Sequence, residues 1–161
     1  MRVTMSKEQY NYLANHMAYI QREKLNMIKG FSMDYDSYIG MLDFLNGYIK
    51  NMEDLLDNAI ITTSETQPPF VVIGSTALIT RNGVTSEYSV IMPSGGHLSR
   101  QRAGTQALIV GSSDANTLLF KVPGDKVTLD AIGQSGQIQS IIYDPIFLME
   151  KYTYDSEKFA V

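Results

Sequence analysis

The stretch GFSMDYDSYIG, residues 30–40, separates two long segments whose apolar residues follow a helical spacing. Apolar residues recur every three or four positions from Tyr10 to Phe31, apart from one lysine, and again from Tyr38 to Ala59. This spacing places the apolar side chains of each helix on a narrow stripe. Two such stripes joined by a short turn predict an antiparallel helical hairpin, and two amphipathic helices packed on a globular core are the alternative.

The tip of this hairpin is the most prominent feature that the pattern predicts. Ser6 and Gln9 have the spacing of a capping box, in which two residues exchange hydrogen bonds between side chain and backbone at a helix start. Each helix then covers roughly 23–25 residues, which makes the hairpin about 35 Å long at 1.5 Å per residue. Its tip carries Asp34 and Asp36 with Tyr35 between them, and these three residues are therefore candidate site residues.

The composition restricts the classes of function. The 161 residues are 44% hydrophobic and 19% charged, which is typical of a globular protein. A net charge of −4 disfavours a nucleic-acid coat, and we expect no sequence-specific DNA binding. The chain has no cysteine and two histidines, which excludes disulfides, thiolate metal sites and a histidine-rich metal centre. No apolar run reaches the length of a signal peptide or membrane span, so we expect a cytoplasmic protein with no membrane partner.

The character of the chain changes near residue 62. Residues 62–69, TTSETQPP, are polar and end in two prolines, and we interpret them as a linker that follows a coiled-coil hairpin of residues 1–61. A second domain is predicted for residues 70–144. Residues 145–161 then form a C-terminal extension, and its apolar start favours docking onto the body of the protein or onto a partner.

The second domain is predicted to be built from five strands and a short helix. Asn82 and Gly83 are the strongest hairpin signal, and Gly133 and Gly136 predict a turn before the last strand. The predicted strands cover residues 70–80, 86–92, 105–111, 125–132 and 137–144. A helical turn is expected at residues 113–120, and the whole predicts an α+β fold with a curled antiparallel sheet.

Several segments resemble, in their order and spacing, the GreA/GreB family of transcript-cleavage factors that bind bacterial RNA polymerase. MSKEQYNYLANHMAYI (5–20) is similar to the opening helix of the family, and GYIKNMEDLLDNAII (47–61) is similar to the end of its second arm. The segments that resemble its C-terminal domain are VIGSTALI (72–79), LIVGSSDANTLLFKVPGDKVTL (108–129) and GQSGQIQSIIY (133–143). The resemblance covers most of the chain and implies a coiled-coil hairpin followed by a domain similar to FKBP-type prolyl isomerases.

The resemblance also implies a mechanism and a set of site residues. In the family, the C-terminal domain docks at the rim of the polymerase secondary channel, and acids at the inserted tip help to hold a catalytic Mg²⁺, for which carboxylates are suitable ligands. By this resemblance, Asp34 and Asp36 are candidate ligands of a Mg²⁺ shared with the polymerase, and the chain has no cofactor of its own. The implied polymerase-docking residues are Ser112, Ser113, Asp114, Leu118 and Leu119.

The hairpin departs from the family in its length and in its tip. Alignment of both ends leaves it roughly a dozen residues shorter, which removes about 9 Å of reach at 1.5 Å per residue. The family tip has an Asp-x-x-Glu spacing, whereas Asp34 and Asp36 lie only two positions apart. Aspartate is also a favoured N-cap, so capping of the second helix is the alternative to metal binding.

These observations predict an RNA polymerase-binding elongation regulator that acts at the secondary channel and modulates, rather than strongly stimulates, transcript cleavage. A conventional cleavage-stimulating factor that uses Asp34 and Asp36 is the alternative, and an FKBP-like prolyl isomerase is a remote one that rests on fold analogy. Since no Walker, HExxH or GxSxG motif occurs, we expect no enzyme activity beyond stimulating the RNA hydrolysis that the polymerase performs.

Three other features can be interpreted from the sequence. The loop that carries Arg100 and Arg102 contains no acid, and it is either a solvated flexible loop or a contact for nascent RNA or an acidic polymerase surface. Leu118 and Leu119 are either docking residues or core residues. His16 lies within the first predicted helix, and we expect it to be an ordinary surface residue.

Overall fold

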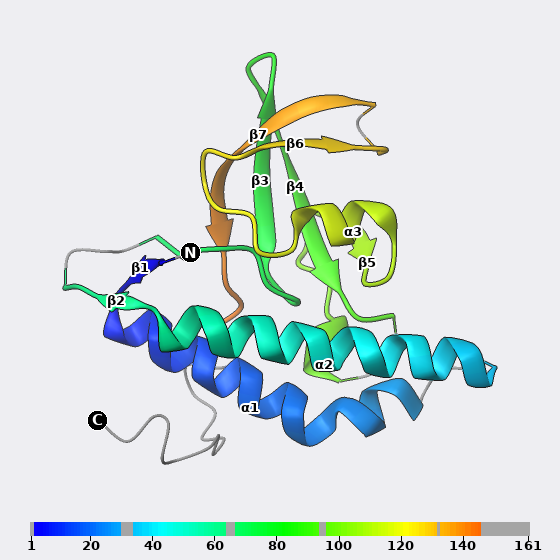
Figure 1. Cartoon of the computed structure of the whole chain (residues 1–161). Helices are drawn as coiled ribbons and strands as arrows, with labels where there is room; N and C mark the ends of the chain where they lie inside the picture. The colour runs from blue at the N-terminus through cyan, green and yellow to red at the C-terminus, as the bar shows by residue number, and fades with distance from the viewer. Residues whose placement is uncertain (1, 30–33, 64–66, 94–95, 132, 146–161) are drawn as a thin grey trace. The chain divides into compact units, whose positions relative to one another are not determined.

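The computed structural model describes residues 2–29, 34–63, 67–93, 96–131 and 133–145 (Figure 1). The chain divides into two compact units, one that contains the first 66 residues and one formed by Gln67–Asp144. The first unit is mainly helical, and the second is a five-stranded sheet with one short α-helix among its described residues. The predicted α+β class is therefore confirmed. Residues 30–33 of the predicted tip and residues 146–161 of the predicted extension lie outside the described residues.

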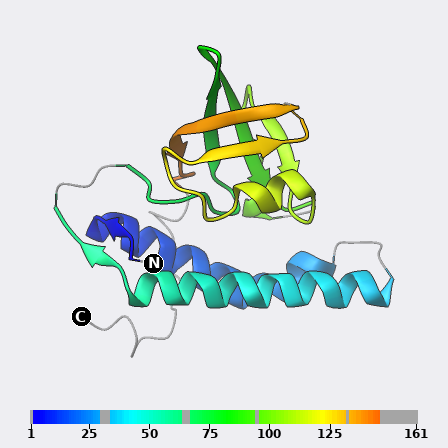
Figure 2. The same ribbon diagram turned by 45° about the horizontal axis from the view of Figure 1, so that its top comes forward.

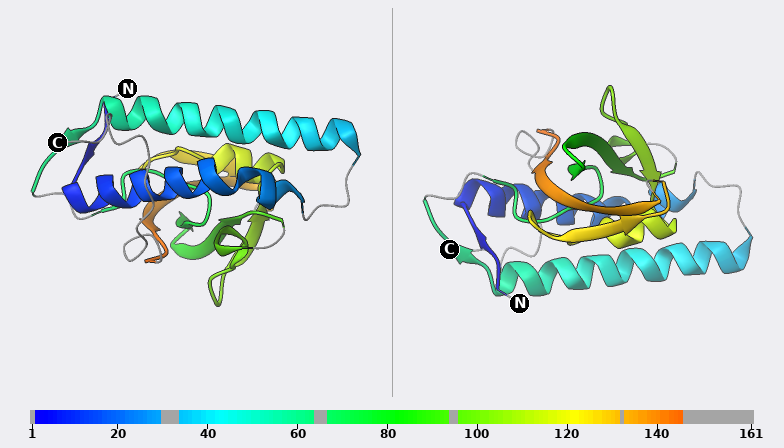
Figure 3. Two further views of the ribbon diagram at one scale, coloured as in Figure 1. Left: turned by 90° about the horizontal axis from the view of Figure 1, so that it is seen from below. Right: turned by 90° about the horizontal axis from the view of Figure 1, so that it is seen from above.

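The first unit is an antiparallel pair of helices, as predicted. Helix α1 covers Lys7–Lys29 and α2 covers Tyr35–Asp57, and the two run side by side in every view (Figures 1 and 3). Each has 23 residues, which corresponds to about 34 Å at 1.5 Å per residue. The predicted capping box is confirmed, because the Gln9 amide donates to Ser6 Oγ at 3.0 Å and the Ser6 amide donates to Gln9 Oε1 at 2.9 Å.

The buried face of α1 is broader than the narrow stripe that the sequence predicts. Its buried residues are Tyr12, Leu13, His16, Met17, Ala18, Tyr19, Ile20, Met27 and Ile28. With 3.6 residues per turn, these positions cover more than half of the helix circumference. The prediction of a surface position for His16 is wrong, because its side chain is 0% exposed and its Nε2 lies 2.7 Å from the Tyr48 hydroxyl. Helix α2 keeps the narrower pattern, with Leu45, Tyr48, Ile49, Met52 and Leu56 buried.

Two short strands, which the sequence pattern did not predict, close the base of the hairpin. Strand β1 covers Thr4–Met5 and pairs in parallel with β2, Ile60–Ile61. The Ile60 amide donates to the Val3 carbonyl, and the Thr62 amide donates to the Met5 carbonyl, both at 2.9 Å. These bonds join the two ends of the helical pair. Among the described residues, no helix is long and apolar enough to cross a membrane.

The second unit contains β3 (Thr76–Arg81), β4 (Val84–Ile91), β5 (Gln106–Ile109), α3 (Ser113–Leu118), β6 (Lys126–Leu129) and β7 (Gln134–Ile142). The strand order is β5-β4-β3-β7-β6. All neighbours are antiparallel except β4 and β5, which are parallel and so depart from the all-antiparallel expectation. Residues 92–105 supply the long crossover that a parallel pair requires.

The sheet curls along β7, because the two halves of this strand pair with different strands. Its C-terminal half pairs with β3 and its N-terminal half pairs with β6 (Figure 2). The register between β3 and β7 shifts between Leu78 and Ile79 of β3. A register shift of this kind bends a strand and increases its twist. Asn82 and Gly83 form the predicted turn with positive φ values of 51° and 79°, as the twist of a two-residue hairpin requires. Gly133 lies in the β6–β7 turn, but Gly136 lies within β7 opposite Val127.

The first strand of the second unit is shorter at its start than predicted, because β3 begins only at Thr76 and residues 70–75 lie outside it. The Val71 amide donates to the Lys121 carbonyl at 2.9 Å, and the Phe120 amide donates to the Val71 carbonyl at 2.8 Å. Helix α3 ends at Leu118 and Phe120 has a non-helical φ of 66°, so α3 is shorter than the helix expected at residues 113–120. The Phe120 ring lies 5.7 Å from that of Phe70, which is fully buried.

Candidate functional site

The tip of the hairpin begins, in the described chain, with Asp34. Its backbone is extended, and its Oδ1 accepts a hydrogen bond of 2.8 Å from the Ser37 amide at the start of α2. This contact satisfies one of the amides that a helix N-terminus leaves without an intrahelical partner. The bond from the Ser37 backbone lowers the pKa of Asp34. Capping of α2 by Asp34 is therefore observed, and metal binding by Asp34 and Asp36 stays a prediction.

The other two tip residues point to solvent. Tyr35 is 76% exposed, and Asp36 is exposed in the first turn of α2, where the helix dipole favours a negative charge. Within the described part of the chain, no three His, Cys, Asp or Glu side chains gather where they could hold a metal ion. Since Mg²⁺ prefers six ligands in an octahedral arrangement, Asp34 and Asp36 would need ligands from another molecule to hold it.

Asp34→Ala is expected to destabilise the hairpin, because alanine cannot accept the bond from Ser37. The melting temperature of the helical unit should fall by roughly 4–8 °C, as is usual for the loss of an N-cap in a unit of this size. Circular dichroism of the helical signal during heating measures this effect. Asp34→Ser retains a capping oxygen, so its melting temperature should stay close to that of the wild type, and the same is expected for Asp36→Ala. If Asp36→Ala lowered the melting temperature as much as Asp34→Ala does, the assignment of the cap to Asp34 would be contradicted.

The segment predicted to dock on the polymerase surrounds helix α3. Ser112 is the N-cap of α3, and its Oγ accepts from the Ala115 amide. Both Ser112 and Ser113 are exposed. Leu118 is 0% exposed and Leu119 is 8% exposed. The structure therefore places the two leucines in the core of the second unit, as the core alternative describes, and leaves the two serines at its surface.

Asp114 has a structural role that the sequence did not reveal. Its carboxylate accepts hydrogen bonds from the amides of Asp130 and Ala131, at 2.7 and 3.0 Å. These amides follow β6 and begin the turn into β7. Asp114 therefore joins the first turn of α3 to a loop that lies 16 positions away in the sequence.

Asp114→Ala is expected to lower the free energy of unfolding of the second unit by about 1–2 kcal/mol, because two amides lose a charged acceptor near the surface. Denaturation with urea measures the loss, and amide hydrogen exchange should accelerate at Asp130 and Ala131. The matched control is Ser113→Ala, which removes a neighbouring exposed hydroxyl. If both variants lost the same stability, the carboxylate would not be the cause.

The loop with the two candidate arginines is folded in its described part. It contains a short 3-10 helix at His97–Ser99, in which Leu98 is 2% exposed and its carbonyl accepts from the Met92 amide at 2.8 Å. The Thr105 hydroxyl lies 2.8 Å from the Ser89 hydroxyl and donates to the Arg102 carbonyl. Arg100 and Arg102 are both exposed. The structure thus presents the two arginines on a loop that is held at both ends.

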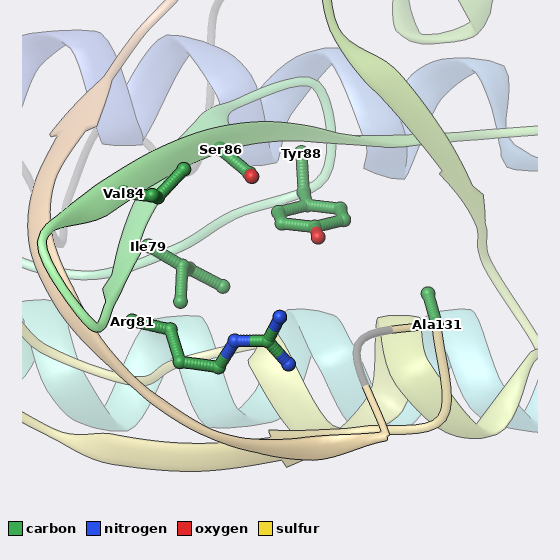
Figure 4. Close-up of a pocket in the computed structure, with 6 residues that line it drawn as sticks. All are labelled: Ile79, Arg81, Val84, Ser86, Tyr88 and Ala131. Carbon is green, nitrogen blue, oxygen red and sulfur yellow. The ribbon is translucent and has the colours of Figure 1, made fainter.

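A cavity of about 150 Å³ lies on one face of the β3–β4 hairpin (Figure 4). It is lined by Ile79, Arg81, Val84, Ser86, Tyr88 and Ala131. The side chains from each strand are two positions apart and so share a face of the sheet, and Ala131 closes the cavity from the β6–β7 turn. The alternation of SEYSVIM was the one sequence signal for this face, but the cavity itself depends on the pairing of distant segments. Among these six described residues Tyr88 is the one aromatic side chain, whereas FKBP-type pockets are lined by several.

The fold and these sites define a class of protein in which a helical hairpin with an aspartate-capped tip is joined to a small curled β domain. No family model matches the sequence, and no curated protein matches it. Among solved structures, the chain is similar to GreA factor homolog 1 (Gfh1) of Thermus thermophilus, with 17% identity, coverage of 88% of this chain and 99% of that chain, and a TM-score of 0.38.

Two further Gfh1 structures have the same level of similarity. A structure described as the transcription factor Gfh1 has 18% identity, coverage of 88% of this chain and 97% of that chain, and a TM-score of 0.38. Gfh1 of Thermus aquaticus has 17% identity, coverage of 88% and 98%, and a TM-score of 0.37. Similarity of this size carries no argument about function, which therefore rests on the residues of this chain.

Proposed function

We propose that this chain binds bacterial RNA polymerase and regulates transcript elongation by placing its hairpin in the secondary channel. The observation that carries the proposal is the hairpin itself, whose paired helices of 23 residues end at a tip with exposed Tyr35 and Asp36. The sequence of both arms resembles the hairpin of the GreA/GreB family, which works through its tip. A narrow pair of helices about 34 Å long suits insertion into a channel.

The tip favours a modulating role over strong stimulation of cleavage. Asp34 already accepts the Ser37 amide, so one of its two carboxylate oxygens is engaged in the helix cap. Asp36 is the tip carboxylate for which the structure shows no such capping bond. Asp36 is then the one tip carboxylate that is not used in the cap, and it lies on a shortened hairpin. The chain would therefore affect access to the channel and to the polymerase-held Mg²⁺ more than it would supply ligands for this Mg²⁺. It would have no catalytic activity of its own.

The second unit is proposed to dock at the rim of the channel. Because Leu118 and Leu119 are buried, the docking surface is proposed to be formed by Ser112 and Ser113 at the exposed start of α3. Arg100 and Arg102 would contact an acidic polymerase surface or nascent RNA, since a guanidinium pairs well with carboxylate and phosphate.

Binding is tested by capture of purified bacterial RNA polymerase on the immobilised chain. We expect capture by the wild type, weaker capture by a Ser112→Tyr/Ser113→Tyr variant with added bulk on the proposed surface, and weaker capture by Arg100→Gln/Arg102→Gln. Asp114→Asn, whose side chain is used inside the unit, is the control for general damage. Absence of capture by the wild type would refute the proposal.

The mode of action is tested with backtracked polymerase complexes that carry labelled RNA. We expect the wild type to change elongation without marked RNA shortening. Shortening that is lost in Asp34→Ser/Asp36→Asn would instead establish a conventional cleavage factor, and this variant keeps the helix cap while it removes both charges. The prolyl isomerase alternative predicts faster isomerisation of a proline peptide, which we do not expect from a cavity lined by a single aromatic residue.

A further inference from the structure

We propose that the cavity on the β3–β4 hairpin binds a small carboxylate-bearing molecule. The guanidinium of Arg81 and the hydroxyls of Ser86 and Tyr88 point into the same space (Figure 4). A guanidinium pairs with a carboxylate through two parallel N–H···O bonds, and its five donors allow it to hold a ligand and a protein partner together. The two hydroxyls can donate to the carboxylate lone pairs that remain.

The charge of the lining supports an anion. Arg81 is the one charged residue among the six that line the cavity, and none of the six is an acid. Ile79 is 1% exposed and Tyr88 is 3% exposed, so the floor of the cavity is packed into the unit. Side chains that are already held by packing lose little freedom when a ligand binds, which favours binding by a small molecule.

The volume of the cavity and the apolar part of its lining indicate which kind of anion would bind. A volume of about 150 Å³ corresponds to roughly five waters at about 30 Å³ each. It lies below the roughly 300–1,000 Å³ of drug-sized pockets, so the cavity cannot enclose a nucleotide. Ile79, Val84 and Ala131 supply the smaller, apolar part of the lining, which could contact a short alkyl group. A carboxylate with a short alkyl body uses both the guanidinium and this surface, whereas inorganic phosphate uses only the guanidinium.

The proposal is tested by titration of the ¹⁵N-labelled full chain with butyrate, followed by amide chemical shifts. We expect saturable shifts confined to residues 79–88 and Ala131. Butyramide has the same shape without the charge, and we expect it to bind at least about tenfold more weakly than butyrate. Inorganic phosphate lacks the alkyl body, and we expect the same loss for it. Equal binding of butyramide would overturn the role of the carboxylate, and tighter binding of phosphate would overturn the choice of ligand.

Three variants locate the site. Arg81→Gln is expected to weaken butyrate binding about tenfold or more, because the charged fork is lost. Ser86→Leu fills the cavity and leaves Arg81 in place, so it should abolish the shifts even if Arg81→Gln fails to fold. Arg100→Gln, at an exposed arginine outside the cavity, should bind as the wild type does. Unchanged binding by Ser86→Leu, or an equal loss in Arg100→Gln, would overturn the proposal.

Discussion

Gly74→Ala is expected to lower the free energy of unfolding of the second unit by about 2–5 kcal/mol, through backbone strain and overpacking together. Gly74 has a φ of +91°, a conformation that residues with a Cβ rarely adopt. A Cβ built at this position would lie 2.9 Å from Leu98 Cδ2, which is closer than such atoms approach. Leu98 is 2% exposed, so it has little room to move away. Denaturation with urea measures the loss.

Two comparisons separate the causes of this loss. Gly47→Ala makes the same chemical change in the exposed middle of α2, where no atom outside the local helix backbone lies within 4 Å of the added Cβ. It should stabilise the helix by about 0.5–1 kcal/mol, because alanine has the higher helix propensity. The double variant Gly74→Ala/Leu98→Ala should lose less free energy of unfolding than the two single variants lose together, because truncation of Leu98 removes the clash. Strictly additive losses would show that Leu98 is not the obstacle.

The helical hairpin could be predicted because its signals are local. The capping box needs only Ser6 and Gln9, and the spacing of apolar residues is set by the geometry of one helix. The turn at Asn82 and Gly83 is local as well, since two positive φ values are needed within two residues. Capping by Asp34 could be proposed for the same reason, because the bond spans three positions.

The other features depend on partners that are distant in the sequence. The alternation of apolar and polar residues identifies a strand but not whether it runs parallel or antiparallel to its neighbour. The parallel pairing of β4 with β5 could therefore not be predicted. Asp114 resembled a docking residue until its contacts with the Asp130 and Ala131 amides were seen. The cavity requires the register of β3 and β4 and the position of the β6–β7 turn. His16 is likewise buried through a partner, Tyr48, that lies 32 positions away.

The first unit is expected to lose about 2 kcal/mol of stability between pH 7 and pH 5 through His16 alone. Burial lowers the pKa of His16 from 6.5 to about 3 in the folded protein. Because the folded pKa lies below the unfolded one, the unfolded chain binds the extra proton between these values. The contribution of neutral His16 is therefore complete above about pH 6.5 and falls by about 1.36 kcal/mol per pH unit as the pH decreases toward 3. Urea denaturation followed by the helical signal at several pH values measures this slope.

His16→Gln is the variant that isolates this effect. Glutamine does not titrate, and its amide can replace the imidazole as the hydrogen-bonding partner of the Tyr48 hydroxyl. The stability of this variant should therefore be lower than that of the wild type at pH 7, because the ring packing is lost, but nearly level between pH 7 and pH 5. The difference between the two proteins should shrink by about 2 kcal/mol over that interval. His97→Gln removes the other histidine and should retain the wild-type slope. If the slope disappeared in His97→Gln and persisted in His16→Gln, the buried histidine would not be its source.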